Sequence, residues 1–275
     1  MAVVLIEVLV MFGVFGLLAR LSPCNPEQGR FISRDLPDNA LWWMFGVLLY
    51  GDAAGAMIRA GAGLALGARG AAASTTIFAG YGWAARSPLW LQVVAILVVM
   101  DFIQYWLHRL FHGRTLWPFH AVHHSAEELE WTTTFRIHPL NFIVYGAGVL
   151  ALTQLMGFSP AAFAVVAVFN QVIGALVHAN LNWTWGPFRY VIASPVYHRW
   201  HHVKDPAIYN TNFAPNFPIW DLMFGTYYMP KGELPRDYGV EGAPTHFLAS
   251  LVWPFREFVT RFVPPRKADA AAARP

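Results

Sequence analysis

Residues 101–124, DFIQYWLHRLFHGRTLWPFHAVHH, carry two histidine patterns within a predicted apolar helix and its continuation. The first pattern is the pair His108 and His112, which lie one turn apart on a helix and can reach a single ion. The second is a His-x-x-His-His pattern that recurs further along the chain. Its members are His120, His123 and His124 in the first copy and His198, His201 and His202 in the second. Neutral imidazole is the commonest side-chain metal ligand, so these residues predict a polyhistidine metal site.

The composition places this site in a membrane protein. The chain is 56% hydrophobic and only 13% charged, with a mean hydropathy of +0.39, whereas soluble domains are about a quarter charged. Long apolar runs cover residues 1–19, 41–66, 89–112, 139–157 and 160–181. Each is long enough to be a helical span, so we expect an all-α integral membrane bundle of about four to five spans. Because no basic segment precedes the first run, it is expected to be a retained helix and not a signal peptide.

The Lys and Arg residues predict which side of the membrane holds the histidines. Positive side chains follow the first, third and fifth runs: Arg20, Arg30, Arg34, Arg109, Arg114, Arg136, Arg189, Arg199 and Lys204. The opposite connections hold only Arg69 and Arg86. The positive-inside rule therefore puts the N-terminus outside and every histidine motif on the cytoplasmic side. After Trp183 the chain has no long apolar run, and we expect a cytoplasmic helical cap with some helices in the membrane interface.

Composition also limits the chemistry. The formal charge is only +3 and forms no dense basic stripe, which argues against nucleic-acid binding. The single cysteine, Cys24, excludes an internal disulfide and any cysteine-based zinc or iron–sulfur site. A zinc hydrolase uses three or four protein ligands, and the eight motif histidines exceed one such site.

Direction on a helix favours two ions over one. Adjacent residues differ by about 100° in direction, so His123 and His124 can serve different ions. The same holds for His201 and His202, which makes a dinuclear site the favoured interpretation. Neutral imidazoles suit iron, copper or zinc.

Three further residues stand near the motifs in this topology. His178 ends the fifth run at the predicted depth of His108 and is a candidate ninth ligand. His138 begins the fourth run on the same side and is a candidate ligand or a support for one. Asp101 lies about two turns before His108 on the same helical stripe. We expect its carboxylate to accept a ring N–H from a ligand, with a helix–helix hydrogen bond as the alternative.

From about Asp101 to Pro230 the chain resembles the fatty acid hydroxylase/sterol desaturase superfamily of integral membrane diiron enzymes. The matching motifs are Asp101-x-x-x-Tyr105-Trp-x-His108-Arg-x-x-His112, Trp117-x-x-His120-x-Val-His123-His124-Ser125, His178-x-Asn180, Pro195-x-x-His198-Arg-x-His201-His202 and Asn212…Trp220-Asp221-x-x-Phe224-Gly225-Thr226-Tyr227. The resemblance implies that the eight motif histidines and His178 bind two non-haem irons, which zinc can replace in purified protein. It also implies dioxygen as co-substrate and electrons from a separate donor protein. The reaction would hydroxylate or desaturate an unactivated C–H bond in a sterol, fatty acyl or ether lipid.

The chain departs from this superfamily at one position and leaves the substrate approach open. Some members carry another histidine one turn before the position of His178, where this chain has Gly174. We expect His138, or a water held by Asn182, to take its place. The short spacing of the first histidine pair is nearer to the sterol desaturase and alkylglycerol monooxygenase branches than to the fatty-acid 2-hydroxylases. The aromatic residues expected to line the substrate approach, with interface packing as the alternative, are Trp131, Phe135, Tyr197 and Trp200.

Two other classes of protein fit parts of the pattern. A zinc-dependent membrane hydrolase would need a general-base carboxylate beside the ligands, and the chain has no His-Glu-x-x-His motif. A metal transporter or sensor would place histidines on both faces of the membrane and at mid-span. The favoured interpretation is one membrane-embedded oxygenase domain. Its N-terminal spans cover 1–100, its catalytic core 101–230 and its cytoplasmic tail 231–275.

Overall fold

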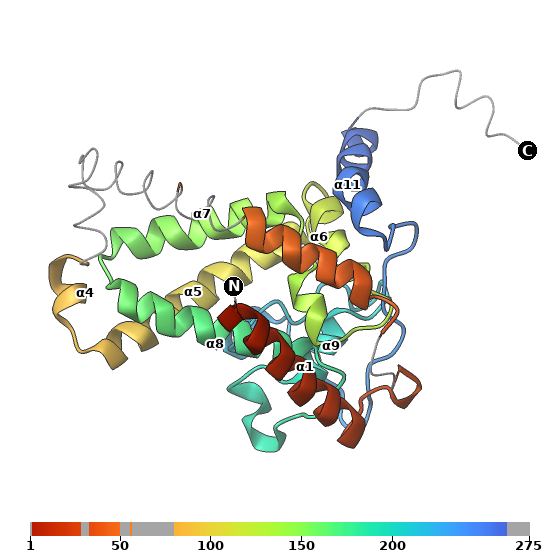
Figure 1. Ribbon diagram of the computed structural model, residues 1–275, viewed down its shortest axis with the longest axis horizontal. Helices are drawn as coiled ribbons and strands as arrows, with labels where there is room; N and C mark the ends of the chain where they lie inside the picture. The colour runs from red at the N-terminus through yellow and green to blue at the C-terminus, as the bar shows by residue number, and fades with distance from the viewer. Residues whose placement is uncertain (1, 29–32, 50–55, 57–79, 263–275) are drawn as a thin grey trace, which may run out of the picture.

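The computed structural model describes residues 2–28, 33–49, 56 and 80–262, and this part of the chain is helical (Figure 1). Its α-helices are α1 (Ala2–Leu21), α4 (Gly82–Arg86), α5 (Leu89–Phe111), α6 (Trp117–His124), α7 (Pro139–Leu155), α8 (Pro160–His178), α9 (Pro195–His201), α10 (Ile219–Phe224) and α11 (Phe247–Phe262). A further helix includes residues 36–49. The 3-10 turns are η1 (Pro26–Gln28), η2 (Trp131–Phe135) and η3 (Gly186–Tyr190). Within the described residues the extended pairing is limited to one isolated bridge, so the all-α prediction is confirmed.

Three long helices form the apolar body of the molecule. Figure 1 shows α5, α7 and α8 side by side, with α4 at one end and α9 at the other, and α5 packs on both of its neighbours. α5 and α8 are 23 and 19 residues long and are apolar enough to cross a membrane. α7 has 17 residues, and the described part of the predicted span 41–66 belongs to helix 36–49. The other predicted spans remain predictions.

A tight turn reverses the chain between α7 and α8, as the Gly157-Phe158-Ser159-Pro160 stretch predicts. Gly157 has a φ of +75°, and a Cβ there would collide with the carbonyl oxygen of Tyr81. The Ser159 side chain accepts a hydrogen bond from the Ala162 backbone N–H and caps α8, and Pro160 occupies its first turn. The turn therefore sets α8 antiparallel to α7.

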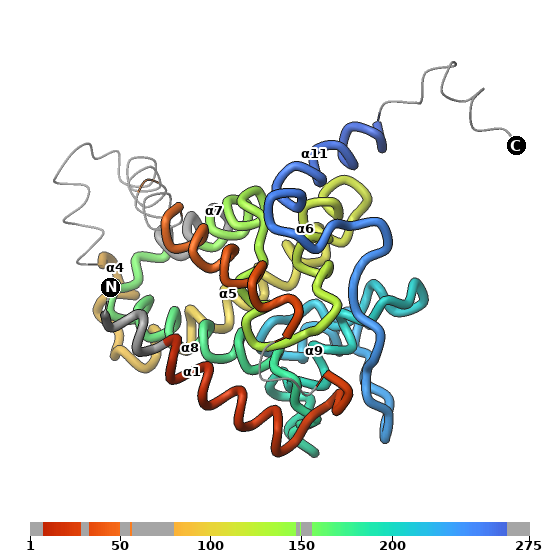
Figure 2. Tube along the Cα trace, turned by 45° about the vertical axis from the view of Figure 1, so that its right-hand side comes forward, coloured from red at the N-terminus to blue at the C-terminus, as the bar shows by residue number. Residues whose placement is uncertain are grey.

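The two His-x-x-His-His copies lie on two short helices at one end of this body. α6 carries the first copy and α9 the second, and both are buried along almost their whole length. α9 begins with a Ser194 cap and Pro195, the sequence pattern of a helix start. Figure 2 shows α6 lying between α11 and α9.

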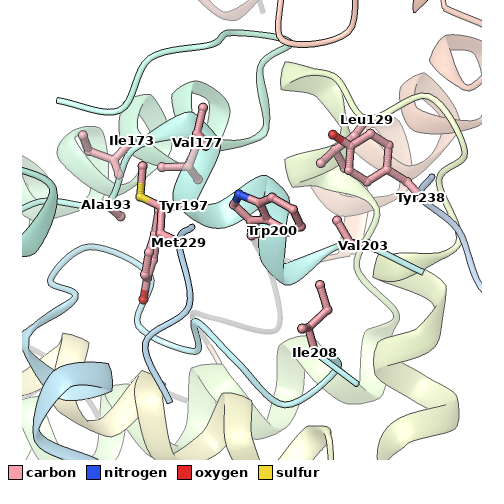
Figure 3. Close-up of a cluster of buried hydrophobic side chains, with 11 residues drawn as sticks. Leu129, Ile173, Val177, Ala193, Tyr197, Trp200, Val203, Ile208, Met229 and Tyr238 are labelled. Atoms are coloured by element: carbon pink, nitrogen blue, oxygen red, sulfur yellow. The ribbon is translucent and has the colours of Figure 1, made fainter. Parts of the chain in front are cut away.

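An apolar cluster holds α9 in place. Figure 3 shows Tyr197 and Trp200 of α9 among side chains of α8 and of the chain that follows α10. Tyr197 is fully buried and its hydroxyl donates to a carboxylate oxygen of Asp221 at 2.5 Å, while Trp200 packs edge-on against Tyr228. Burying such large aromatic side chains fixes the position of the second histidine motif.

Candidate metal centre

The structure brings all nine predicted histidines together in two adjacent groups. One group is His108, His112, His120, His124 and His201, and the other is His123, His178, His198 and His202. Within each group the potential ligand atoms lie within 4.8 Å of one another. They come from α5, α6, α8 and α9, or from the residue that follows a helix, so four separate helices meet here.

The adjacent histidines of each motif separate as their helical directions predict. His124 belongs to the first group and His123 to the second, while His201 belongs to the first and His202 to the second. Each motif therefore contributes to both groups. The stacked rings of His124 and His202, 4.3 Å apart, form part of the boundary between the groups.

Backbone carbonyls determine which ring nitrogens are protonated. Nδ1 of His108 lies 2.7 Å from the Phe213 carbonyl oxygen, and Nδ1 of His178 lies 2.6 Å from that of Gly174. Nδ1 of His123 similarly lies 3.2 Å from a carbonyl oxygen. A carbonyl can only accept, so each Nδ1 donates and each Nε2 is left with a free lone pair.

These free lone pairs point at one another. Nε2 of His178 lies 3.1 Å from Nε2 of His123 and 3.0 Å from Nε2 of His198. The facing Nε2 atoms of His123 and His178 are both unprotonated and cannot share a hydrogen bond, so their close approach is unfavourable unless a cation lies between them. Ligands on an ion with metal–nitrogen distances of about 2.1 Å are about 3.0 to 3.4 Å apart. The spacing therefore suits a bound metal.

The group that contains His108 also has ring nitrogens placed as metal ligands would be. Nε2 of His108 and of His120 are 2.9 Å apart. The Nε2 atoms of His112, His124 and His201 are buried and have no hydrogen-bond partner in the described part of the chain. Buried polar atoms are normally paired, so three such nitrogens in one group are accounted for by a shared ion.

Burial keeps the motif imidazoles in the form that binds metal. Burial lowers the pKa of all six histidines of the two His-x-x-His-His copies well below the usual value, and neighbouring imidazoles lower it further. These histidines are His120, His123, His124, His198, His201 and His202. A neutral imidazole keeps its lone pair, so the site is prepared for a cation at neutral pH.

Two fully buried arginines support the histidines, and the sequence interpretation missed them. Arg136 accepts from His123 through its carbonyl, while its guanidinium pairs with Asp35 at 2.7 Å and donates to Asn39 at 2.9 Å. Arg199 donates to the carbonyl oxygens of Leu129 and His178, at 2.7 and 3.2 Å.

The environment of the second guanidinium is unusual. Arg199 also donates to the side-chain oxygen of Asn25 and lies 4.8 Å from the centroid of the Tyr238 ring. No carboxylate pairs with it among the described residues. The positive-inside argument counted Arg136 and Arg199 as loop charges, but both are completely buried. The signal for Arg199 was its place inside the second histidine motif.

An apolar cavity of about 600 Å³ opens onto both groups. α5, α7 and α8 form its walls, and five histidines line its inner end: His108, His120, His123, His178 and His198. Four carboxamide residues, Gln104, Asn141, Asn170 and Asn216, interrupt the apolar lining. Gly174 also lines it, and a Cβ there would approach the Thr134 hydroxyl oxygen to 2.8 Å.

Three residues expected to bind or support a metal lie elsewhere. Asp101 accepts from the backbone N–H groups of Asn216 and Phe217 and from the Trp220 indole, so it secures a loop and does not contact a histidine ring. Nδ1 of His138 accepts from a backbone N–H and its Nε2 lies 3.3 Å from the Leu251 carbonyl oxygen, which leaves no nitrogen for a metal. The Asn182 side chain is exposed.

The four aromatic residues expected at the substrate approach do not line this cavity. Trp131 stacks on Phe15 of α1 with ring centroids 5.7 Å apart, and Phe135 packs beside it. Tyr197 and Trp200 belong to the cluster around α9. In this structure all four residues take part in core packing, the alternative interpretation.

The two histidine groups lie within the part of the chain that matches a known protein family. The family described as "Fatty acid hydroxylase" matches residues 93–226, which contain all nine histidines of the two groups. Over these residues, just under half of the chain, the protein is similar to the fatty acid hydroxylase family.

Several curated proteins are related to the same chain. Ornithine lipid hydroxylase OlsE of Rhizobium tropici is 36% identical over 175 residues, which are 63% of this chain and 53% of that protein. Alkylglycerol monooxygenase of Xenopus tropicalis is 32% identical over 154 residues, 55% and 33% of the two chains. Very-long-chain aldehyde decarbonylase GL1-4 of Oryza sativa subsp. indica is 24% identical over 167 residues, 54% and 26% of the two chains. The matched part of the chain thus spans about half the length of the ornithine lipid hydroxylase and about a third or less of the other two relatives. No solved structure matches the chain.

Proposed function

We propose that this protein is a membrane-embedded diiron oxygenase that uses dioxygen and electrons from a separate donor protein to hydroxylate or desaturate a lipid. The observation that carries the proposal is the pair of histidine groups, whose ring nitrogens converge beside an apolar cavity. Two of the related proteins are named for oxygenation of lipids, an ornithine lipid and an alkylglycerol, which supports a lipid substrate.

The two histidine groups would each hold one iron, and together the irons would supply the activation of dioxygen and the oxidation of a C–H bond. The protein's own contribution is orientation. Carbonyl contacts at Nδ1 of His108, His123 and His178 fix the ring tautomers and aim each Nε2 into the centre. Such outer contacts also raise the basicity of a ligand.

The cavity would hold the lipid tail against the five histidines at its inner end. Its walls belong to the candidate spans α5 and α8 and to α7, so a tail could enter from the bilayer. Gln104 lies one turn before His108 on α5 and also lines the cavity. We propose that its carboxamide binds a polar group of the lipid near the carbon that reacts.

The proposed topology has five spans and an outside N-terminus. The C-terminal ends of α5 and α8 both contribute histidines to the two groups, so these two candidate spans meet the groups at the same end. This supports a centre on a single side of the membrane, which the positive-inside rule makes the cytoplasmic side. The electron donor would dock on the cap formed by the segments after Trp183.

The alternative functions have less support. Both groups contain only histidines, so within the described residues no carboxylate lies among the ligands to act as the base of a zinc hydrolase. A metal transporter would need ligands spread along a path through the membrane. Here the ligands gather at one end of the long helices.

Metal analysis with an oxygen-uptake assay tests the proposal. Protein prepared in iron-replete, reducing conditions is expected to hold about two irons per chain and to consume dioxygen when electrons and membrane lipid are supplied. His123→Ala and His202→Ala should lose iron and activity. His246→Ala is the matched control, because His246 is exposed and belongs to neither group. Zinc at one ion per chain, with no oxygen uptake after ferrous reconstitution, would refute the oxygenase and favour a hydrolase.

A further inference from the structure

α11 has an apolar face that the rest of the protein does not cover. Five of its apolar side chains are between 52% and 75% exposed: Leu248, Val252, Phe255, Val259 and Phe262. On an α-helix these positions share an arc of about 80°. The buried residues of α11, Ser250 and Pro254, lie on a different face. The exposed stripe therefore lies on a different side from these buried residues, and within it Phe255 also packs against Phe119 of α6.

Three contacts fix α11 at the level where α5 ends and α7 begins. Phe119 of α6 packs against two phenylalanine rings of α11. Nε2 of His138, the residue before α7, lies 3.3 Å from the Leu251 carbonyl oxygen. Arg114, which closely follows α5, and Arg261 each donate to the other's carbonyl oxygen, at 3.2 and 2.8 Å. If α5 and α7 cross a bilayer, α11 lies at the surface of that bilayer.

Positive charge accompanies the apolar stripe. Arg114 and Arg256 are exposed, and Arg261 is half-buried at the end of the helix. Figure 1 shows α11 running across the ends of the long helices and not alongside them. An exposed apolar stripe, with arginines on other sides of the helix and beside it, on a helix that lies across the spans, is the arrangement of helices that lie in a membrane interface.

The geometry points to α11 as an interfacial helix, with its exposed stripe among the acyl chains and its arginines at anionic phospholipid headgroups. Among the occupants that could cover the stripe, a bilayer is favoured because the contacts to α6 and His138 place the stripe at the level of the span ends. This inference concerns how the protein sits on lipid and goes beyond the proposed reaction. It rests only on the proposed crossing of the bilayer by α5 and α7.

Spin-label accessibility in the full chain, reconstituted in phosphatidylcholine–phosphatidylglycerol bilayers, tests the inference. The single native cysteine is buried, so a nitroxide can be attached to one introduced cysteine at a time. The test positions are Val252→Cys and Val259→Cys. Thr260→Cys is the matched control on the exposed polar side of α11, and Val98→Cys, 42% exposed on α5, reports on the span itself. Metal content equal to that of the parent shows that each labelled protein is folded.

We expect the labels at 252 and 259 to collide with dissolved oxygen more than with a water-soluble nickel chelate, as at 98. The label at 260 should show the reverse preference. Equal nickel access at 252, 259 and 260 would overturn the inference, because the stripe would then face water. Labels at 252 and 259 that neither reagent reaches would also overturn it, in favour of a protein partner or a second copy. Nickel access at 98 would refute the span across the bilayer and, with it, the placement of α11.

Discussion

The two copies of the His-x-x-His-His motif have the same ligands but different supports. On α6 the supporting cation is Arg136, and it is neutralised by the carboxylate of Asp35. On α9 the supporting cation is Arg199, which is held by carbonyl and carboxamide oxygens and by the face of Tyr238. The motif thus determines which nitrogens converge, while the way they are held depends on other parts of the chain.

Both supports lead to the connection that follows α1. Asn25 contacts Arg199, and Asp35 and Asn39 contact Arg136. These three residues precede the segment 93–226 that matches the family. Asn25 and Asp35, which lie between the two helices, and Asn39 of helix 36–49 are therefore part of the frame of the histidine groups, although none of the three belongs to either group.

Breaking one histidine group at a time should have the largest effect. His112→Ala changes only the first group and His178→Ala only the second. In each variant we expect the metal content to fall from about two ions to about one per chain, with loss of oxygenase activity, because both ions are needed for the reaction. Elemental analysis and oxygen uptake measure the two effects. Loss of both ions in each variant would show that the groups bind metal as one unit.

Lowering the pH should destabilise the folded protein through both histidine motifs alike, because burial is the main reason that their imidazoles stay unprotonated. The unfolded chain binds protons near pH 6.5, while the folded chain, in which burial lowers the pKa of motif imidazoles such as His124 and His202, does not. The stability of the metal-free protein is therefore expected to fall as the pH drops below 6.5. One pH unit lower, each imidazole costs on the order of 1 kcal/mol.

Thermal unfolding of chelator-treated protein between pH 8 and pH 5.5 measures this dependence. His246→Ala should show the same dependence as the parent, because His246 is exposed. A melting temperature that stays constant across this range would contradict neutral, desolvated imidazoles in the folded protein.

Removing the two arginines should separate the two kinds of support. Arg136→Met leaves the buried carboxylate of Asp35 without its cation, so we expect a loss of about 3–5 kcal/mol. Arg199→Met leaves only unpaired carbonyl and amide groups, and about 1–3 kcal/mol is expected. Thermal unfolding of both variants in one detergent measures the difference. Adding Asp35→Asn to Arg136→Met should restore part of the stability, and an equal cost for the two arginines would contradict the contrast.

A smaller effect on metal binding is expected from changing Asn141, whose side chain contacts a histidine of the first motif copy. Nδ1 of His120 lies 2.9 Å from the side-chain oxygen of Asn141, whereas Nδ1 of His198 has no partner in the described residues. Asn141→Leu should weaken metal binding about 10- to 100-fold, because outer contacts orient the ligand ring. Asn141→Asp keeps the acceptor and is the control. Competition with a chelator measures the affinity, and equal metal release from the leucine variant and the parent would contradict this role.

Local periodicity explains what the sequence could predict. The spacing of His123, His124, His201 and His202 determines their directions on a helix, and the structure places them in the predicted separate groups. The start of α8 was equally readable, because it depends on the neighbouring residues Ser159 and Pro160.

Contacts between distant segments explain what the sequence could not predict. Asp101 lies on the expected stripe of α5, yet the loop that holds Asn216 reaches it first and occupies its oxygens. Trp131 and Tyr197 are both aromatic residues near the histidine motifs. Trp131 stacks on Phe15 of α1, whereas Tyr197 packs in a cluster that includes side chains of α8. Nothing local to Arg136 shows that Asp35, far back in the chain, neutralises it.

The distribution of the nine histidines over four helices has a consequence for how the protein matures. His108 leaves the ribosome long before His202, and neither group is complete until the second motif has docked against α6 and α8. A metal ion can therefore bind fully only after the long-range packing has formed, which couples metal loading to the end of folding. The ratio of bound metal to protein would then report the correctly folded fraction of a preparation before any substrate is known.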